Sequence, residues 1–244
     1  MKRDWHTMKI DELSAILETP PSLVDAELAL CELGDRIRLR ELSAIPEDLH
    51  QLLAEHLVAP DPVVQLEAAI VLAELADTRA ISVLVSATKK RKHRLEALRA
   101  MAKIKHPDIT AALESWLGRF WGHWADKLQA AASLASQGND DALAYLRARC
   151  LSRKPLERCS ALELLGESRH PQAIESIQEY LIDPARPEWL SAARGLAMHR
   201  SPEAKIRLKS ALGSVDAELR GSVMDWLNER HLSLEVEAQP KEVG

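Results

Sequence analysis

An aromatic and basic stretch, RFWGHWADK at residues 119–127, offers the most distinctive chemistry in this chain of 244 residues. It places Phe120, Trp121 and Trp124 within five positions, although the whole chain holds only nine aromatic residues of the Trp, Tyr and Phe types. Flat apolar rings interleaved with cations suit an acidic peptide, an acidic protein face or a nucleic-acid backbone. The stretch is therefore the first candidate for a binding surface.

A run of cations precedes these aromatic residues. Residues 1–80 carry 7 basic and 16 acidic side chains, whereas residues 81–154 carry 14 and 6, in a chain whose formal net charge is −5. The segment around the sequence KKRKH supplies Lys89, Lys90, Arg91, Lys92, Arg99, Lys103 and Lys105. This positive band indicates an anionic partner, and the alternative is that it is an ordinary solvated face.

Motifs for enzyme chemistry are missing. The chain has no HExxH, no GxSxG, no glycine-rich phosphate loop and no cluster of Cys and His. Cys31, Cys150 and Cys159 form no CxxC and have no His at ligand spacing, which argues against disulfides and zinc and favours a reducing compartment. We expect no catalytic residue, no metal site and no cofactor.

The distribution of apolar residues does not indicate a membrane protein. The N-terminal sequence MKRDWHTMKIDELSAIL has no apolar run of signal-peptide length, and no stretch approaches the roughly 18 apolar residues of a membrane span. The sequence therefore predicts a cytoplasmic protein that does not bind membranes.

The elements that hold these side chains are helices in a repeat. Leu, Ala, Glu and Arg dominate the composition, which predicts an all-α protein. Alanines recur every 31 residues, and polar residues three positions before them mark helix starts. The alanines are Ala80, Ala111, Ala142, Ala173 and Ala204, and the polar residues are Asp77, Asp108, Asn139, His170 and Ser201.

A second set of columns predicts a second helix in each repeat. Its small residues are Ala68, Ala130, Ala161, Ala192 and Val223, and its large ones are Leu72, Leu134, Leu165, Leu196 and Leu227. The second helix of the third repeat aligns with the others only if it is placed two residues early. We expect two extra residues in the turn KIKHPD, at residues 103–108, to restore the 31-residue register. Short helix pairs bury such stripes only by stacking, so the pattern predicts an α-solenoid.

Two stretches carry a family resemblance. DPVVQLEAAIVL at 61–72 and DAELRGSVMDWL at 216–227 resemble the HEAT repeat, in particular the short form called PBS-lyase HEAT-like. The resemblance implies a right-handed α-solenoid (α-α superhelix) of about six to seven helix pairs. We expect an N-terminal cap at 1–21, the solenoid at 22–230 and a flexible tail at 231–244.

Each column, meaning a set of positions 31 residues apart, predicts whether an aromatic residue in it is buried or exposed. Phe120 shares its column with Leu151 and Ile182, which predicts a core residue. The columns of Trp121 and Trp124 are mostly polar, so these two rings either contact a partner or fold back onto the second helix. The column of Trp116 is ambiguous and favours the core.

One column on the second helices is mostly basic. It comprises Gln65, Arg94, Lys127, Arg158, Trp189 and Arg220. These residues are expected to form a ladder along one edge of the inner surface. In the family such residues often pair with the Asp of the turn, as Asp61 and Asp216 would here. Arg94 and Lys127 lie beside turns without an Asp, which favours a binding role for them.

The resemblance spans scaffolds, assembly factors and a few enzymes. HEAT-type iron hydroxylases rely on repeated His-Glu pairs, which this sequence does not contain. HEAT-like DNA glycosylases use a basic groove, aromatic side chains and an aspartate, and Asp126 is the acid with such surroundings. Its alternative role is a solvent-facing residue or a partner of Lys127.

We therefore expect a non-enzymatic HEAT-repeat scaffold or adaptor whose partner is an acidic protein. The alternatives are a nucleic-acid-binding protein resembling the glycosylases and a factor resembling the bilin lyases. The expected partner-binding residues are Trp121, Trp124, Lys127, Arg94, Arg91, Lys92, Arg158, Trp189 and Arg220.

Overall fold

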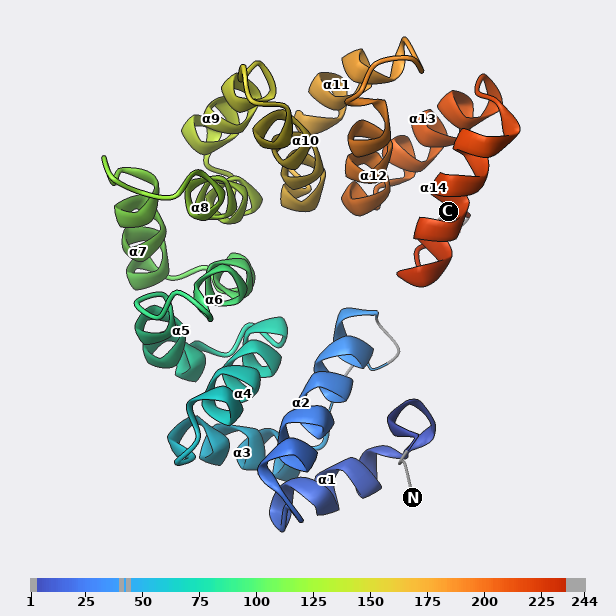
Figure 1. Cartoon of the computed structure of the whole chain (residues 1–244). Helices are drawn as coiled ribbons and strands as arrows, with labels where there is room; N and C mark the ends of the chain where they lie inside the picture. The colour runs from blue at the N-terminus through green and yellow to red at the C-terminus, as the bar shows by residue number, and fades with distance from the viewer. Residues whose placement is uncertain (1–3, 40–41, 43–44, 236–244) are drawn as a thin grey trace, which may run out of the picture. The chain divides into compact units, whose positions relative to one another are not determined.

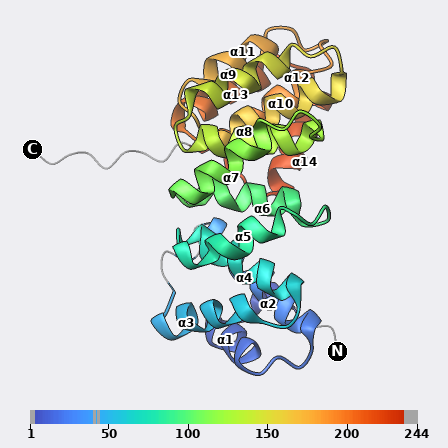
Figure 2. The same ribbon diagram turned by 90° about the vertical axis from the view of Figure 1, so that its left-hand side faces the viewer.

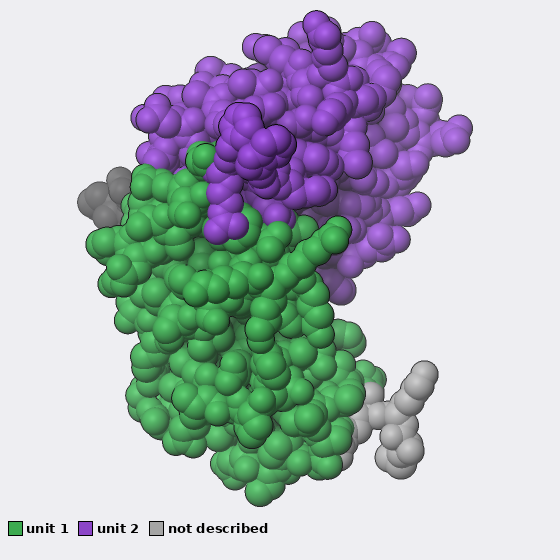
Figure 3. All heavy atoms as spheres, turned by 60° about the vertical axis from the view of Figure 1, so that its left-hand side comes forward, with its two compact units in different colours: residues 1–118 green, residues 119–244 purple. Residues whose placement is uncertain are grey.

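The computed structural model describes residues 4–39, 42 and 45–235, and the chain divides into two compact units, residues 1–118 and 119–244 (Figure 3). Among these described residues, α-helices and short 3-10 helices are connected by turns, and no strand occurs. The expected all-α architecture of helix pairs is confirmed. None of the described helices is both long enough and apolar enough to span a bilayer.

In unit 1, a row of second helices is covered by first helices. Its α-helices are α1 (Ile10–Glu18), α2 (Leu23–Arg38), α3 (Glu47–Glu55), α4 (Pro62–Glu74), α5 (Ile81–Ala87), α6 (Arg94–Ala100) and α7 (Pro107–Leu117). Helix α4 packs between α2 and α6, and α3 and α5 lie over it (Figures 1 and 2). Short 3-10 helices are η1 (Trp5–Thr7), η2 (His56–Val58), η3 (Thr78–Ala80) and η4 (Met101–Lys103).

Unit 2 repeats this two-layer arrangement. Its helices are α8 (Trp124–Ser136), α9 (Asp140–Cys150), α10 (Pro155–Ser168), α11 (Ala173–Gln178), η5 (Glu179–Leu181), α12 (Trp189–His199), α13 (Pro202–Gly213) and α14 (Ala217–Glu229). Helix α10 packs between α8 and α12, and α14 contacts α12. Helices α9 and α11 cover this row, each against two of its members (Figure 1).

Several helices begin at the polar residues of the repeat. Asp61 and Asp216 are the N-caps of α4 and α14, and each carboxylate accepts a backbone N–H of the first turn, at 2.7 and 2.8 Å. Asn139 and Ser201 cap α9 and α13 in the same way. Helix α11 differs, because it begins at Ala173 after the N-cap Gln172, not after His170. Of the five predicted N-caps, Asn139, Ser201 and, for the 3-10 helix η3, Asp77 accept such hydrogen bonds, whereas Asp108 and His170 are not the N-caps of their helices.

The core consists of the predicted columns. All ten residues of the second-helix columns, from Ala68 and Leu72 to Val223 and Leu227, are at most 1% exposed. In the first-helix column, Ala80, Ala142, Ala173 and Ala204 are fully buried. These small residues let neighbouring helices pack closely, so the stacking expected from the sequence holds within each unit.

The slip in the third repeat extends further than the sequence indicated. Helix α7 begins at Pro107 after the N-cap His106, two residues ahead of the 31-residue register. Ile109 is therefore buried in place of Ala111, which is exposed. The expectation that the missing residues return in KIKHPD is wrong. The two residues that restore the 31-residue register lie after α7. The turn 118–123 has six residues, whereas the equivalent turn 151–154 has four.

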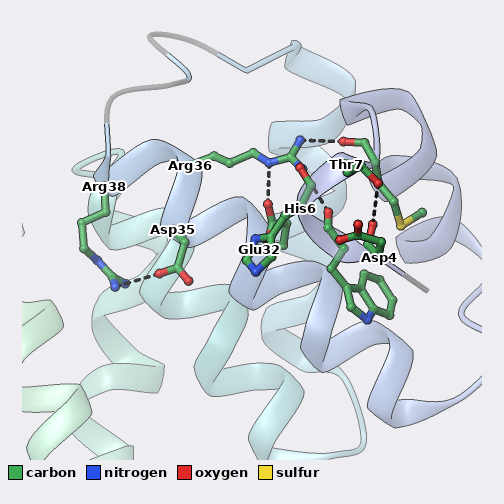
Figure 4. A network of polar contacts seen from close by, with 9 residues as sticks. Asp4, His6, Thr7, Glu32, Asp35, Arg36 and Arg38 are labelled. Atoms are coloured by element: carbon green, nitrogen blue, oxygen red, sulfur yellow. Dashed lines mark hydrogen bonds and ion pairs between the residues drawn. The ribbon is translucent and has the colours of Figure 1, made fainter. Parts of the chain in front are cut away.

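A polar network holds the first residues of the described chain. The Arg36 guanidinium on α2 donates to the carbonyl oxygens of Met8 at 2.7 Å and Trp5 at 3.0 Å, and to the Glu32 carboxylate at 2.7 Å (Figure 4). His6 contacts the other oxygen of Glu32 at 2.9 Å. The predicted cap at 1–21 thus contains α1 and residues 5–8, which α2 binds through Arg36 and Glu32. In the predicted tail, residues 236–244 lie outside the described residues.

Candidate partner-binding site

The turn between α7 and α8 presents two aromatic rings to solvent. Phe120 is 85% exposed and Trp121 is 93% exposed, and their ring centroids lie 4.9 Å apart in an edge-to-face arrangement. The prediction that Phe120 is a core residue is wrong. Phe120 and Trp121 lie in the turn 118–123, outside both α7 and α8, and their rings are exposed there.

The second tryptophan of the stretch has a local role. Trp124 is the first residue of α8, is half-buried, and stacks on His123 with ring centroids 5.5 Å apart. This agrees with the alternative in which the ring folds back onto the start of the second helix. Asp126 is buried, so its interpretation as a solvent-facing residue is wrong. Trp116 is in the core of unit 1, as its column favoured.

Phe120 has an exposed apolar counterpart at the equivalent position of each of the next two turns of unit 2. Leu151 is 79% exposed and Ile182 is 81% exposed, and both directly follow the first helix of their pair. We name Phe120, Leu151 and Ile182 the turn row. Sequence reasoning missed it because the column of large apolar residues was interpreted as core. The sequence did contain a signal for exposure, because these positions lie in the turns between the first and second helices.

The turns that carry the turn row are basic at their surface. Their exposed cations are Arg119, Arg153, Lys154 and Arg186, and Asp183 is the one exposed carboxylate of the three turns. Glu188 is buried, and a hydrogen bond of 2.7 Å from Arg158 keeps its pKa below the usual range of a glutamate. The negative charge of Glu188 is therefore balanced by Arg158 inside unit 2, and the exposed charges of the three turns are mostly positive.

The mostly basic column has a structural role that the sequence did not indicate. Five of its members donate a hydrogen bond to a backbone carbonyl between six and eight residues earlier, near the end of the preceding helix. The pairs are Gln65 with Ala59, Arg94 with Thr88, Arg158 with Ser152, Trp189 with Leu181, and Arg220 with Leu212. Carbonyls at a helix end lack intrahelical partners, so five of the six members of this column cap the end of a first helix from the second helix of the same pair.

This capping corrects two expectations. The predicted pairing of the column with Asp61 and Asp216 is wrong, because these carboxylates cap their own helices. Trp189 is wrong as a partner-binding residue, because it is 1% exposed and its indole N–H is bound 3.2 Å from the Leu181 carbonyl. The buried Trp189 indole thus donates to a helix-end carbonyl in the way that the arginines of this column do.

The other predicted residues fall in separate places. Arg91 and Lys92 are exposed in the turn before α6, and Arg94 lies over the Trp116 ring at 4.4 Å from its centroid, all within unit 1. Lys127 is half-buried in unit 2, with its side chain against the backbone of Gly122. The predicted binding set is thus divided between the two units, and Trp121 is its most exposed member in unit 2.

Side chains suited to enzyme chemistry are poorly placed. Burial raises the pKa of the Cys31 thiol to about 12, with Glu67 adding to the effect, and burial alone raises that of Cys150 to about 12. Thiols in such surroundings stay protonated and are weak nucleophiles. Among the described residues, no three His, Cys, Asp or Glu side chains converge in a way that would hold a metal ion.

Comparisons with known proteins agree with this architecture. A family model described as HEAT repeats matches residues 45–119, and one described as PBS lyase HEAT-like repeat matches residues 157–183. A chain of the complex of CpcE and CpcF of phycocyanin lyase from Nostoc sp. PCC7120 has a similar fold. It is 16% identical, with a TM-score of 0.52, and the match covers 91% of this chain and 95% of that one.

Two further solved structures align less well. Human deoxyhypusine hydroxylase in complex with glycerol is 16% identical, with a TM-score of 0.36 and coverage of 91% of this chain and 95% of that chain. An engineered protein is 21% identical, with a TM-score of 0.34 and coverage of 91% and 68%. No curated protein sequence matches the chain.

Proposed function

We propose that this chain, which belongs to the HEAT-repeat family in its short PBS-lyase-like form, binds an acidic protein partner through the turn 118–123. The chain is a repeat scaffold of stacked helix pairs. Scaffolds of this kind present side chains from successive repeats on one extended surface. The proposal locates the contact in unit 2 and gives the chain no catalytic role.

One observation carries the proposal. The Trp121 indole is 93% exposed, in a turn whose other ring, Phe120, is 85% exposed. Contiguous exposed apolar side chains are rare on soluble proteins outside interaction sites, and tryptophan is the residue most enriched at binding hot spots. The surrounding cations favour an acidic partner, because opposite charges speed encounter and select against basic proteins.

A non-enzymatic role is supported by the state of the reactive groups. The pKa of the half-buried Cys31 thiol and of the buried Cys150 thiol is raised to about 12, which favours the protonated, weakly nucleophilic form, and Asp126 is buried. The lyase activity named above belongs to that protein, and a likeness of 16% identity to it supports only a shared fold. A cytoplasmic location and the lack of a cofactor remain parts of this proposal.

Trp121→Ser should weaken partner binding without destabilising the chain. We expect the affinity for an acidic partner to fall at least about tenfold, because a central aromatic anchor is lost. The melting temperature should change by less than about 2 °C, because the indole contributes little to packing. The partner is identified by placing a photo-crosslinking amino acid at position 121 and analysing the crosslinked products by mass spectrometry.

The matched control is Ile206, which is 58% exposed on α13 of the same unit. A crosslinker at position 206 should not capture the same protein, and Ile206→Ser should retain binding. Equal capture from both positions would refute the Trp121 site. A large fall in the melting temperature of Trp121→Ser would show instead that the ring packs against its own chain.

Nucleic-acid binding is a second candidate, favoured by the turn before α6. Lys89, Lys90, Arg91 and Lys92 are four consecutive exposed cations. If they contact phosphates, affinity for duplex or single-stranded DNA should fall steeply between low and moderate salt, with a slope of about one per contact. Lys90→Gln combined with Lys92→Gln should reduce that slope. Failure to bind either DNA at low salt would eliminate this candidate.

A further inference from the structure

The turn row has a regular spacing that the proposed function does not require. Phe120, Leu151 and Ile182 are 31 residues apart in sequence, and they lie in unit 2, in the turns that precede α8, α10 and α12. Their exposed fractions are between 79% and 85%. The next positions of the same register are Lys89 and Gly213, so the apolar row has three members.

Hydrogen bonds between turns hold two members of the turn row side by side. The Tyr180 hydroxyl, two residues before Ile182, donates to the carbonyl oxygen of Cys150, directly before Leu151, at 3.1 Å. On the other side of these turns, Arg158 of α10 contacts Glu188, which precedes α12. Because α10 also packs on α8, the three turns follow the order α8, α10 and α12.

Helices in a packed layer lie about 8–10 Å apart, so the turn row should repeat at about that interval. An α-helix rises about 1.5 Å per residue, so side chains seven positions apart lie on one face at about 10.5 Å. We infer that the turn row binds an amphipathic α-helix of the partner, with apolar residues seven positions apart facing Phe120, Leu151 and Ile182. This inference rests on the proposed scaffold function and specifies the partner element.

Other backbone conformations fit the row less well. Side chains on one face of a strand are separated by about 6.6 or 13 Å, and neither distance matches the interval. A polyproline helix repeats every third residue at about 9 Å, which matches the interval. Such segments dock on grooves lined by aromatic rings, however, and Leu151 and Ile182 are aliphatic. The observations therefore favour the α-helix.

Charge completes the description of the partner helix. Exposed cations flank the turn row in all three turns, as Arg119, then Arg153 with Lys154, then Arg186. Acidic residues beside the apolar face of the incoming helix would lie opposite these cations. The partner element is therefore an acidic amphipathic helix, and a basic helix with the same apolar face is disfavoured.

A designed peptide tests this inference on the full chain. The probe is a lactam-stapled helix of about 18 residues, with three leucines seven positions apart and glutamates beside them. Binding is measured by fluorescence anisotropy for wild type, Leu151→Ser, Ile182→Ser and the control Ile206→Ser. We expect each change in the turn row to weaken binding at least about fivefold and the control to bind like wild type.

Three further peptides define the outcome. Leucines about five positions apart point to different faces of the helix, so this register control should not bind. Replacing the glutamates with lysines should also weaken binding. Equal binding of the register control would overturn the helix inference, and so would tighter binding of a proline-rich peptide with an apolar residue at every third position.

The two proposals fail separately. Suppose that the crosslinker at position 121 captures an acidic protein while the heptad peptide does not bind. The helix inference is then wrong and the scaffold function stands. If the peptide binds in register while position 121 captures no acidic protein, the proposed partner is wrong although the surface geometry holds. The melting temperatures of Leu151→Ser and Ile182→Ser should stay near that of wild type, because both side chains are exposed.

Discussion

Gly166→Ala should lower the free energy of unfolding by about 3 kcal/mol, although alanine normally favours a helix. Gly166 on α10 faces Gly195 on α12, and a Cβ at position 166 would overlap the Gly195 carbonyl oxygen. A Cβ at Gly195 would lie 2.5 Å from the carbonyl oxygen of Leu162. Both obstacles are backbone atoms, so α10 and α12 would have to separate. Urea unfolding followed by circular dichroism measures the change.

Gly221 on α14 is the matched control, because a Cβ there meets no atom within 4 Å. Gly221→Ala should stabilise the chain by about 0.5–1 kcal/mol through helix propensity alone. If Gly166→Ala were neutral or stabilising like Gly221→Ala, the close approach of α10 and α12 would be incorrect.

Trp189→Ala should cost about 3–5 kcal/mol of unfolding free energy. The indole is 1% exposed, so its removal leaves a large cavity in unit 2, and the Leu181 carbonyl loses the donor that caps it. Thermal and urea unfolding measure the loss. The same substitution at Trp121 is the control, and it should shift stability by less than about 0.5 kcal/mol because that ring is 93% exposed.

The pair of tryptophan variants also separates the two roles assigned to the expected binding residues. Trp189→Ala should affect stability, whereas Trp121→Ala should affect partner binding. Similar stability losses in both variants would contradict the exposed position of Trp121. A stable Trp189→Ala variant with weakened partner binding would instead restore the original expectation that Trp189 contacts the partner.

Much of the architecture follows from local chemistry that a sequence displays. The 31-residue columns predicted the buried Ala and Leu stripes, and the polar residues Asn139 and Ser201 marked the N-caps of α9 and α13. Capping and helix periodicity act over one or two turns, so they can be recognised without knowledge of the fold. The family resemblance and the helix-pair repeat were therefore predicted correctly.

Column position alone did not distinguish core from surface at the turns. Phe120, Leu151 and Ile182 share a column and an apolar character, as core residues do, yet all three are exposed. Trp189 sits in a basic column and is buried. Exposure at a turn depends on where the first helix ends and on what covers the crossing chain, and neither is encoded within one repeat.

The sequence by itself determined the repeat, the helix class and the presence of unusual aromatic and basic residues. Only the tertiary structure decided which of them face solvent. Phe120, Leu151 and Ile182 are exposed because each lies in a turn just beyond the end of a first helix, where no neighbouring helix covers it. Folding of each second helix back against the end of its own first helix brought these donors to carbonyls six to eight residues earlier, because donor and acceptor meet only once the turn between them has formed.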